Sequence, residues 1–233
     1  MLKKILYLLS FFILITSLFI YNSFYTNYET LTDDLGNPIT NLPYELTGNK
    51  SSRTIIIFLH GWPNTMSLWD SIIPKFQKDN LCLNISYPNY TEKLKLSWGM
   101  DLREITRYIK KTVELVENNL QNSIGKKKPY QRIVVSHDWG AFLSYLIDHN
   151  YKDFIHEFIN LDIGMGDQKI FSQKISMISY QWKMAFNFLI GNKFFNFGNF
   201  YTKKFLENLM PIYSITEKDF EKINSDYNFF YYH

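Results

Sequence analysis

The residues of this chain best suited to chemistry lie in one short segment, 136–140, with the sequence Ser-His-Asp-Trp-Gly. A run of apolar β-formers at 133–135 precedes the segment, and a helical stretch over 142–150 follows it. Small side chains on both sides of the acidic centre allow a strand to turn sharply into a helix. The central side chain is then exposed at the end of the strand, near the positive end of the helix. This pattern predicts a nucleophile elbow with Asp138 as the nucleophile.

A carboxylate nucleophile attacks a saturated carbon by displacement and leaves an ester on the enzyme, which water then cleaves. Suitable substrates are strained or activated at carbon, as in an epoxide or an alkyl halide. The alternative role of Asp138 is to cap the helix that follows, which is common for aspartate at a strand-helix turn. The flanking small residues and a second motif, described below, favour the nucleophile.

Strands and helices alternate around this segment. Unbroken apolar runs predict strands over 54–59, 81–86 and 154–161, in addition to the strand that precedes Asp138. An apolar stripe at steps of three and four predicts a helix over 102–120, and similar spacing over 68–76 predicts another, with Asn64 or Thr65 as its cap. The alternation from residue 54 to 162 predicts an α/β fold: a mostly parallel sheet with helices on both faces.

The pattern changes after residue 162. Helices rich in aromatic residues are predicted over 172–190, 203–210 and 216–226. We interpret residues 29–162 as an α/β core and residues 163–233 as a helical cap over the C-terminal edge of the sheet. Open α/β proteins bind their ligands at that edge.

The N-terminus carries a candidate membrane segment within residues 1–28. Lys3 and Lys4 precede an apolar run over 5–21, which meets the lower limit of about 17 residues for a bilayer-spanning helix. Bulky side chains occupy the place where a signal peptide carries small residues for cleavage. An uncleaved single-pass anchor is therefore favoured, and a cleaved signal peptide with a secreted protein is the alternative. The flanking charges place the N-terminus in the cytosol and the domain in a lumen or outside the cell.

Composition narrows the list of partners. The net charge is only +3 and evenly spread, which argues against a nucleic-acid partner. The five histidines show no metal-ligand spacing, so neither a metal nor a cofactor is predicted. The single cysteine, Cys82, excludes an intrachain disulfide.

Three features together resemble the α/β-hydrolase superfamily and, within it, the epoxide hydrolase and haloalkane dehalogenase branch. They are the turn His60-Gly61-Trp62-Pro63 after the first long strand, the elbow at Asp138, and the helical insertion after the next strand. The resemblance covers residues 42–232. It implies that Asp138 is the nucleophile and that the backbone N–H groups of Trp62 and Trp139 hold the oxyanion when the ester is hydrolysed.

The branch assignment depends on residue 62. The dehalogenases that this chain resembles carry asparagine there, whose side-chain amide holds the departing halide, whereas His-Gly-aromatic-Pro is more similar to epoxide hydrolases. Those enzymes also use cap tyrosines to donate a proton to the opening epoxide oxygen, and Tyr180 on the first cap helix is the candidate. The implied substrate is a small apolar organic molecule. A haloalkane dehalogenase and a non-catalytic, membrane-tethered binding protein of the same fold are the alternatives.

The resemblance also implies residues that this chain does not supply. Family members continue past the cap with two more strands and carry the catalytic histidine after the last of them, whereas this sequence stops at His233. The expectation is therefore a chain truncated after the cap, in which the ester would form but its hydrolysis would lack a base. Asp162 stands where some members of the branch place the acid partner of that histidine. A second role for Asp162, capping the turn into the cap, stays open.

Overall fold

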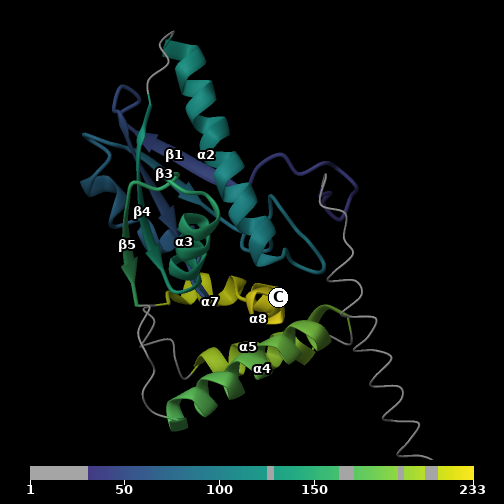
Figure 1. The fold of residues 1–233 in the computed structure, drawn as a ribbon. Coiled ribbons are helices and arrows are strands. Elements are labelled where there is room, and N and C mark those ends of the chain that lie inside the picture. Colours follow the sequence, from purple (N-terminus) through teal and green to yellow (C-terminus); the bar gives the residue numbers. More distant parts are fainter. Residues whose placement is uncertain (1–30, 125–128, 163–170, 194–196, 208–214) are drawn as a thin grey trace, which may run out of the picture. The chain divides into compact units, whose positions relative to one another are not determined.

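The computed structural model describes residues 31–124, 129–162, 171–193, 197–207 and 215–233 (Figure 1). The chain forms two compact units, Met1–Ile39 and Thr40–His233, and the candidate site lies in the second. The predicted anchor over 5–21 lies outside the described residues. Within the described ranges, no helix combines the length and apolar character that crossing a bilayer requires.

A five-stranded sheet forms the core of the second unit, with strand order β1-β3-β2-β4-β5. The antiparallel pair is β1 with β3, and the other three pairs are parallel, which confirms the predicted mostly parallel α/β sheet. The strands are β1 (Tyr44–Gly48), β2 (Thr54–Leu59), β3 (Leu81–Ile85), β4 (Gln131–His137) and β5 (Glu157–Leu161).

The register of the parallel strands brings the sequence motifs together. β2 and β4 pair Leu59 with Ser136, so the two segments that follow these residues leave the same edge of the sheet side by side. β4 and β5 pair His137 with Leu161, which places the residue after β5 beside the elbow. Three segments far apart in the sequence therefore meet at one end of the sheet.

Helical elements cover both faces of the sheet. The helices α2 (Leu102–Ile124) and α3 (Trp139–Asn150) pack against each other over one face (Figure 1). On the opposite face, Trp69 packs against a cluster of the strand residues Ile56, Phe58 and Cys82.

Trp69 belongs to the first of two short 3₁₀ helices, η1 (Met66–Trp69) and η2 (Ile73–Lys75), where the sequence predicts one α-helix. The prediction of a continuous helix over 68–76 is wrong because Pro74 has no N–H and disfavours the α conformation at the residue before it. The predicted cap Thr65 is confirmed, since its side chain accepts a hydrogen bond from the Ser67 N–H.

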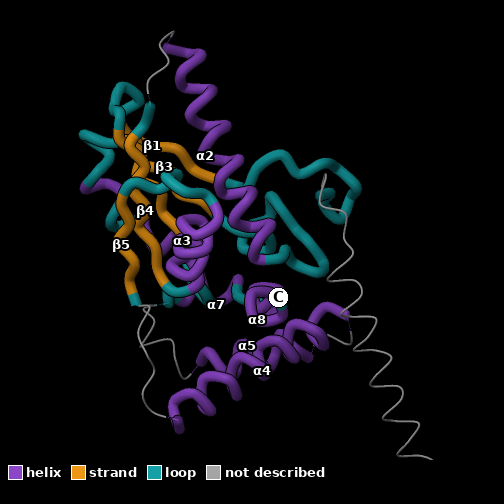
Figure 2. Tube along the Cα trace, viewed as in Figure 1, coloured by secondary structure: helices purple, strands orange, loops and turns teal. Residues whose placement is uncertain are grey.

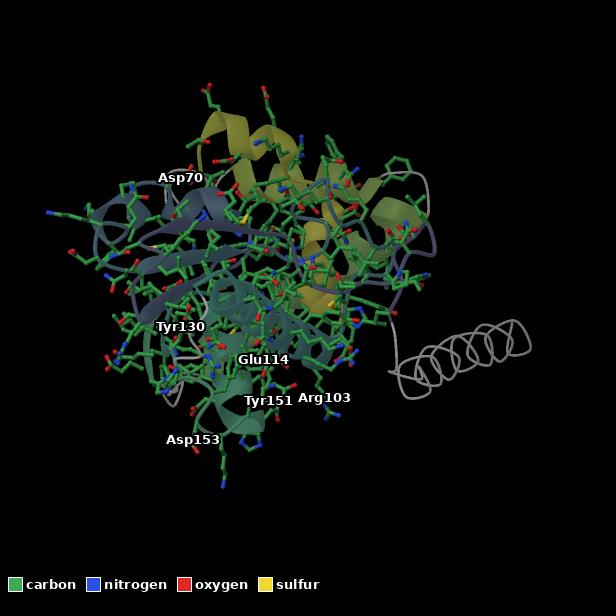
Figure 3. The ribbon with its side chains drawn as sticks, turned by 90° about the horizontal axis from the view of Figure 1, so that it is seen from above. Asp70, Arg103, Glu114, Tyr130, Tyr151 and Asp153 are labelled. Carbon is green, nitrogen blue, oxygen red and sulfur yellow. The ribbon has the colours of Figure 1, made fainter. Side chains whose placement is uncertain are left out.

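Side chains of α2 reach the loop after α3. Lys110 forms an ion pair with Glu114, and its Nζ atom lies 5.6 Å from the centre of the Tyr151 ring. Figure 3 labels Glu114 on α2 and Tyr151 at the end of α3. A second link joins α2 to the sheet, because Arg132 on β4 donates two hydrogen bonds to the Glu117 carboxylate at 2.7 and 2.8 Å.

The segment after residue 170 is helical throughout most of its described parts, as predicted for a cap (Figure 2). Its elements are α4 (Phe171–Lys193), α5 (Phe197–Glu207), α7 (Glu217–Lys222), η3 (Ser225–Asn228) and α8 (Phe229–Tyr232). The second cap helix begins at residue 197, six residues earlier than predicted. In its first turn α5 crosses α4 closely, because a Cβ atom on Gly198 would lie 2.6 Å from the Cα of Gly191 on α4. The boundary between core and cap at residue 162 stays a prediction.

One edge of the sheet is formed by β5. It is the last strand in the order, and Phe158, Ile159 and Leu161 on it are between 41% and 55% exposed. Edge strands with exposed apolar side chains are an aggregation hazard.

Candidate active site

The elbow at Asp138 has the backbone conformation that a nucleophile turn requires. Asp138 follows β4 and precedes α3, with φ 50° and ψ −122°. A positive φ is uncommon for a residue other than glycine, and such residues cluster at functional sites. Among the described residues, the Asp138 side chain accepts no N-cap hydrogen bond from the second or third N–H of α3, so the usual capping bond is not observed. Asp138 also keeps part of its surface accessible.

Two glycines allow the oxyanion turn and the elbow to touch. A Cβ atom on Gly61 would lie 2.6 Å from the Asp138 Oδ2 atom, and one on Gly140 would lie 2.4 Å from the Leu59 carbonyl oxygen. Both distances are far below ordinary contact, so any side chain at either position would separate the two segments. The absence of a side chain at Gly61 and Gly140 therefore allows the Asp138 carboxylate to lie against the turn at Gly61 and Trp62.

The Asp138 carboxylate accepts hydrogen bonds from the two backbone N–H groups that the resemblance implies. The Trp62 N–H donates to Oδ2 at 2.7 Å, and the Trp139 N–H also donates to the carboxylate. Burial raises the pKa of Asp138, while these two N–H donors and the nearby His137 act in the opposite direction. The structure therefore brings the N–H groups of Trp62 and Trp139 together on the carboxyl group. Their role as donors to an oxyanion stays a prediction.

Asp162 lies at the edge of this site. It follows β5 with φ 77°, and its Oδ2 atom is 3.7 Å from the His137 Nε2 atom. Its charge raises the pKa of Asp138, which places the two carboxylates within electrostatic reach of each other. The side chain is 62% exposed, so it faces away from the packed interior. Both roles considered for Asp162 stay predictions.

His60 anchors the turn from inside the core. Its side chain is fully buried, and its Nδ1–H donates to the Gly61 carbonyl oxygen at 3.2 Å. The Tyr87 hydroxyl donates to the His60 carbonyl oxygen at 3.0 Å, and the ring centres of His60 and Tyr87 lie 4.5 Å apart. Burial lowers the pKa of His60 to about 4, so the ring is neutral near pH 7 and holds the turn. The next residues, Trp62 and Pro63, are joined by a cis peptide bond.

The buried His60 makes the stability of the fold depend on pH. Its pKa is about 4 in the folded protein against an ordinary value of 6.5, so the unfolded chain binds the extra proton between these values. The free energy of unfolding is therefore expected to be fully present above pH 6.5 and to fall by about 3 kcal/mol as the pH drops to 4. Urea unfolding at several pH values measures this slope. In His60→Phe, which cannot titrate, the His60 part of the slope should disappear, and an unchanged slope would contradict the assignment.

Two cap tyrosines lie over the elbow. The predicted Tyr180 on α4 contacts Tyr231 on α8, with ring centres 5.7 Å apart, and the two phenols share a hydrogen bond. Tyr231 also contacts the Trp62 ring and the Trp139 ring, each at 5.3 Å, and its hydroxyl is hydrogen-bonded to the Trp139 side chain. Burial raises the pKa of Tyr180, and that of Tyr231 to well above 10, and the Asp138 charge adds to both shifts. Both phenols are therefore protonated at neutral pH.

A second hydrogen-bonded chain joins the oxyanion turn to the cap. The Trp62 indole N–H donates to Asn228 Oδ1 at 2.9 Å, and the Asn228 amide donates to the Thr202 hydroxyl at 2.8 Å. Asn228 and Thr202 are fully buried. The Trp62 indole is therefore held by the cap.

Sequence reasoning missed Tyr231 and Asn228. Both lie in the last seven residues of the sequence, where five of the seven are aromatic. That aromatic density is the signal that could have found them, although it also fits ordinary core packing. Within the described residues, no group of three metal-ligating side chains converges at this site or elsewhere.

Comparison with known proteins identifies the family of this chain. A family model described as the alpha/beta hydrolase fold matches residues 54–209, more than half of the chain. The soluble epoxide hydrolase of Corynebacterium sp. (strain C12) is 22% identical over 111 residues, which cover 48% of this chain and 35% of that protein. Epoxide hydrolase 1 of Caenorhabditis elegans is 25% identical over 150 residues, which cover 62% of this chain and 34% of that protein. The chain thus spans about a third of the length of these two curated relatives.

Solved structures show the same fold. A mutant of an epoxide hydrolase from Bacillus megaterium, in complex with its product, matches with a TM-score of 0.54 and 15% identity, over 83% of this chain and 70% of that one. At this identity the likeness concerns the fold alone. Given the family match, the two sequence relatives and the paired motifs at the sheet edge, the chain belongs to the α/β-hydrolase family, in the branch of the epoxide hydrolases and haloalkane dehalogenases.

Proposed function

We propose that this chain carries the nucleophile half of an epoxide hydrolase. Asp138 Oδ1 attacks an epoxide carbon, the carbon–oxygen bond of the ring breaks, and the released oxygen takes a proton from a cap tyrosine. The product is a hydroxyalkyl ester on Asp138. The observation that carries this proposal is the 2.7 Å hydrogen bond from the Trp62 N–H to Oδ2, because it holds one oxygen and leaves the other to attack.

Water would complete the reaction by attacking the ester carbonyl carbon. Charge then develops on Oδ2, to which the Trp62 N–H is bonded, while the Trp139 N–H donates to the same carboxyl group; collapse of this intermediate releases a vicinal diol and restores the carboxylate. The attacking water must give its proton to a base. In the family this is a histidine after the cap, so complete turnover is proposed for the whole protein and not for these residues alone.

The side chains at the turn favour an epoxide over an alkyl halide. A departing halide needs free N–H donors, but the Trp62 indole N–H is bonded to Asn228. The Trp139 side chain is hydrogen-bonded to Tyr231. An opening epoxide instead needs a proton donor, and two protonated phenols lie over the carboxylate. Because Tyr180 and Tyr231 share one hydrogen bond, one hydroxyl proton of the pair stays available for the substrate oxygen.

The tyrosine pair gives a direct prediction. Proton donation by a placed acid is worth about 10²- to 10⁴-fold in rate, so the double variant Tyr180→Phe/Tyr231→Phe should slow ester formation by that factor. Each single variant should lose less, because the remaining phenol can still donate. Single-turnover mass spectrometry with an epoxide measures the rate, with Tyr44→Phe on β1 as the control. Equal rates in the double variant and the control would show that the phenols have no role in proton donation.

One experiment separates the enzymatic proposal from its alternatives. The purified chain is incubated with styrene oxide and, separately, with 1-bromobutane, and products, intact mass and the modified peptide are analysed. A mass increase at Asp138 with styrene oxide supports the proposal, with or without diol release. Reaction with the halide alone supports a dehalogenase. A folded protein that reacts with neither compound is a binding protein, and the proposal fails.

Membrane attachment through residues 5–21 belongs to the same proposal. These residues lie outside the described ranges, so the apolar run and its flanking lysines are the support. The full-length protein, expressed with its N-terminus intact, should stay in the membrane fraction after extraction with alkaline carbonate. Release into the supernatant would contradict the anchor. A secreted protein that lacks residues 1–28 would show that these residues are a cleaved signal peptide.

A further inference from the structure

The two long cap helices expose large apolar side chains. On α4 the exposed residues recur at steps of four, and on α5 two adjacent residues follow the first at three and four positions, so they lie on one side of each helix; each is between 50% and 71% exposed. We call this set the cap face: Ile178, Trp182, Phe186, Phe197, Phe200 and Tyr201. Monomeric soluble proteins rarely keep a contiguous apolar surface of this kind unless it serves an interaction.

An open cavity joins the two halves of the cap face. It has a volume of about 410 Å³, and its lining residues are Lys183, Met184, Phe186, Asn187, Tyr201 and Phe205. Phe186 on α4 and Tyr201 on α5 belong both to this lining and to the cap face. The cap face is therefore one surface that crosses from α4 to α5, with a largely apolar hollow between the two helices.

The sequence that contains the cap face is rich in positive charge. Residues 171–207 contain five lysines and a single acidic residue, Glu207, although the whole chain has a net charge of only +3. Lys183 lines the cavity, and the Lys204 Nζ atom lies 5.7 Å from the centre of the Phe200 ring. Exposed aromatic side chains with lysines beside them are typical of protein surfaces at the membrane interface.

The lysines beside the cap face also help to choose between a second copy of the chain, a nucleic acid and a lipid bilayer as the partner that covers it. A second copy of the chain, docked through the same face, would bring lysines against lysines. A nucleic acid would match the lysines but would leave Ile178, Trp182 and Phe186 without an apolar environment. We propose that the cap face docks on a lipid bilayer with anionic headgroups, with its aromatic side chains among the upper acyl chains and Lys183 and Lys204 at the phosphates. This proposal depends neither on the reaction at Asp138 nor on the N-terminal segment.

The single native cysteine allows a test at one residue of the full-length protein. Cys82 is buried, with 1% exposure, so a cysteine introduced by Trp182→Cys can be labelled selectively with the fluorophore NBD. On vesicles of phosphatidylcholine and phosphatidylglycerol, NBD emission at residue 182 should shift to the blue and rise several-fold. The matched control is Asn118→Cys, at an exposed position on α2, where no shift is expected. Reversing the charge with Lys183→Glu/Lys204→Glu should weaken the response at residue 182 by about tenfold or more.

The readout at one residue separates docking of the cap from attachment through the N-terminus, which would bring both labelled positions to the vesicle without burying residue 182. The proposal is overturned by an unchanged spectrum at residue 182 on anionic vesicles, or by equal shifts at 182 and 118. A shift in buffer alone that grows with protein concentration also overturns it, because a second copy would then be the occupant. A label-free check uses brominated phosphatidylcholine mixed with phosphatidylglycerol, which should quench the tryptophan fluorescence of the wild-type chain more than that of Trp182→Phe.

Discussion

An Asp138→Asn protein is expected to form no adduct with styrene oxide, whereas the wild-type chain should gain the mass of one epoxide molecule. The amide is a poor nucleophile toward carbon, so the rate of adduct formation should fall on the order of 10⁴-fold or more. Asparagine has the size of aspartate, tolerates the positive φ of 50° at this position, and can still accept the Trp62 hydrogen bond. The loss would therefore report on the carboxylate itself and not on the turn. Intact-mass spectrometry over a time course measures it.

Asp162→Asn is the matched control for this experiment. Asp162 also has a positive φ, 77°, and lies beside the elbow, but it is not expected to react with the epoxide. The variant should form the adduct at a rate close to that of the wild type. If Asp162 serves as the acid partner of a base, the substitution should slow only the release of diol by the whole protein. An adduct that forms equally fast in Asp138→Asn would refute the assignment of the nucleophile.

The second large effect is expected at Gly140. In an ordinary helix, replacing glycine by alanine stabilises the fold by about 1 kcal/mol. Here the new Cβ atom would lie 2.4 Å from the Leu59 carbonyl oxygen and 2.6 Å from that of His60, both of them backbone atoms that cannot rotate away. The steric cost should exceed the gain in helix propensity, so we expect Gly140→Ala to lose about 3 kcal/mol of stability or more. Urea unfolding of the variant and the wild type measures the difference.

The same substitution should also disturb the site in molecules that stay folded. A displaced turn would move the Trp62 N–H away from Asp138 Oδ2, so adduct formation should slow even below the unfolding transition. Asp148→Ala, on an exposed turn of the same helix, should change stability by no more than about 0.5 kcal/mol. A Gly140→Ala protein as stable as the wild type would show that the strand and the helix have more room between them than these distances allow.

The sequence is sufficient to predict the strands and helices that position the candidate site. Four of the five strands have apolar runs that mark them, and the long helix over Leu102–Ile124 follows from its amphipathic stripe. Because parallel strands end at a common edge, the motifs at Trp62 and Asp138 can be expected to meet from the order of the elements alone. Local patterns are enough here, since each motif directly follows its own strand.

The remaining features depend on contacts that local patterns do not report. β1 cannot be placed from its own five residues, which are mixed in polarity, because its strand character comes from pairing with β3. The close crossing of α4 and α5 at Gly191 and Gly198 is a tertiary contact, which the local pattern of either helix does not report. Tyr231 cannot be selected among 17 tyrosines, since its approach to the elbow is decided by how the last helix packs on the core.

The hydrogen bond between the Trp62 indole and Asn228 has a mechanical consequence. The same residue, Trp62, presents its backbone N–H to the carboxylate and its indole N–H to the cap. Any movement that carries Asn228 away from the turn must break the indole bond, and the turn then loses a contact that holds Trp62 in place. The position of the cap and the stabilisation of charge on Asp138 are thus coupled through one residue.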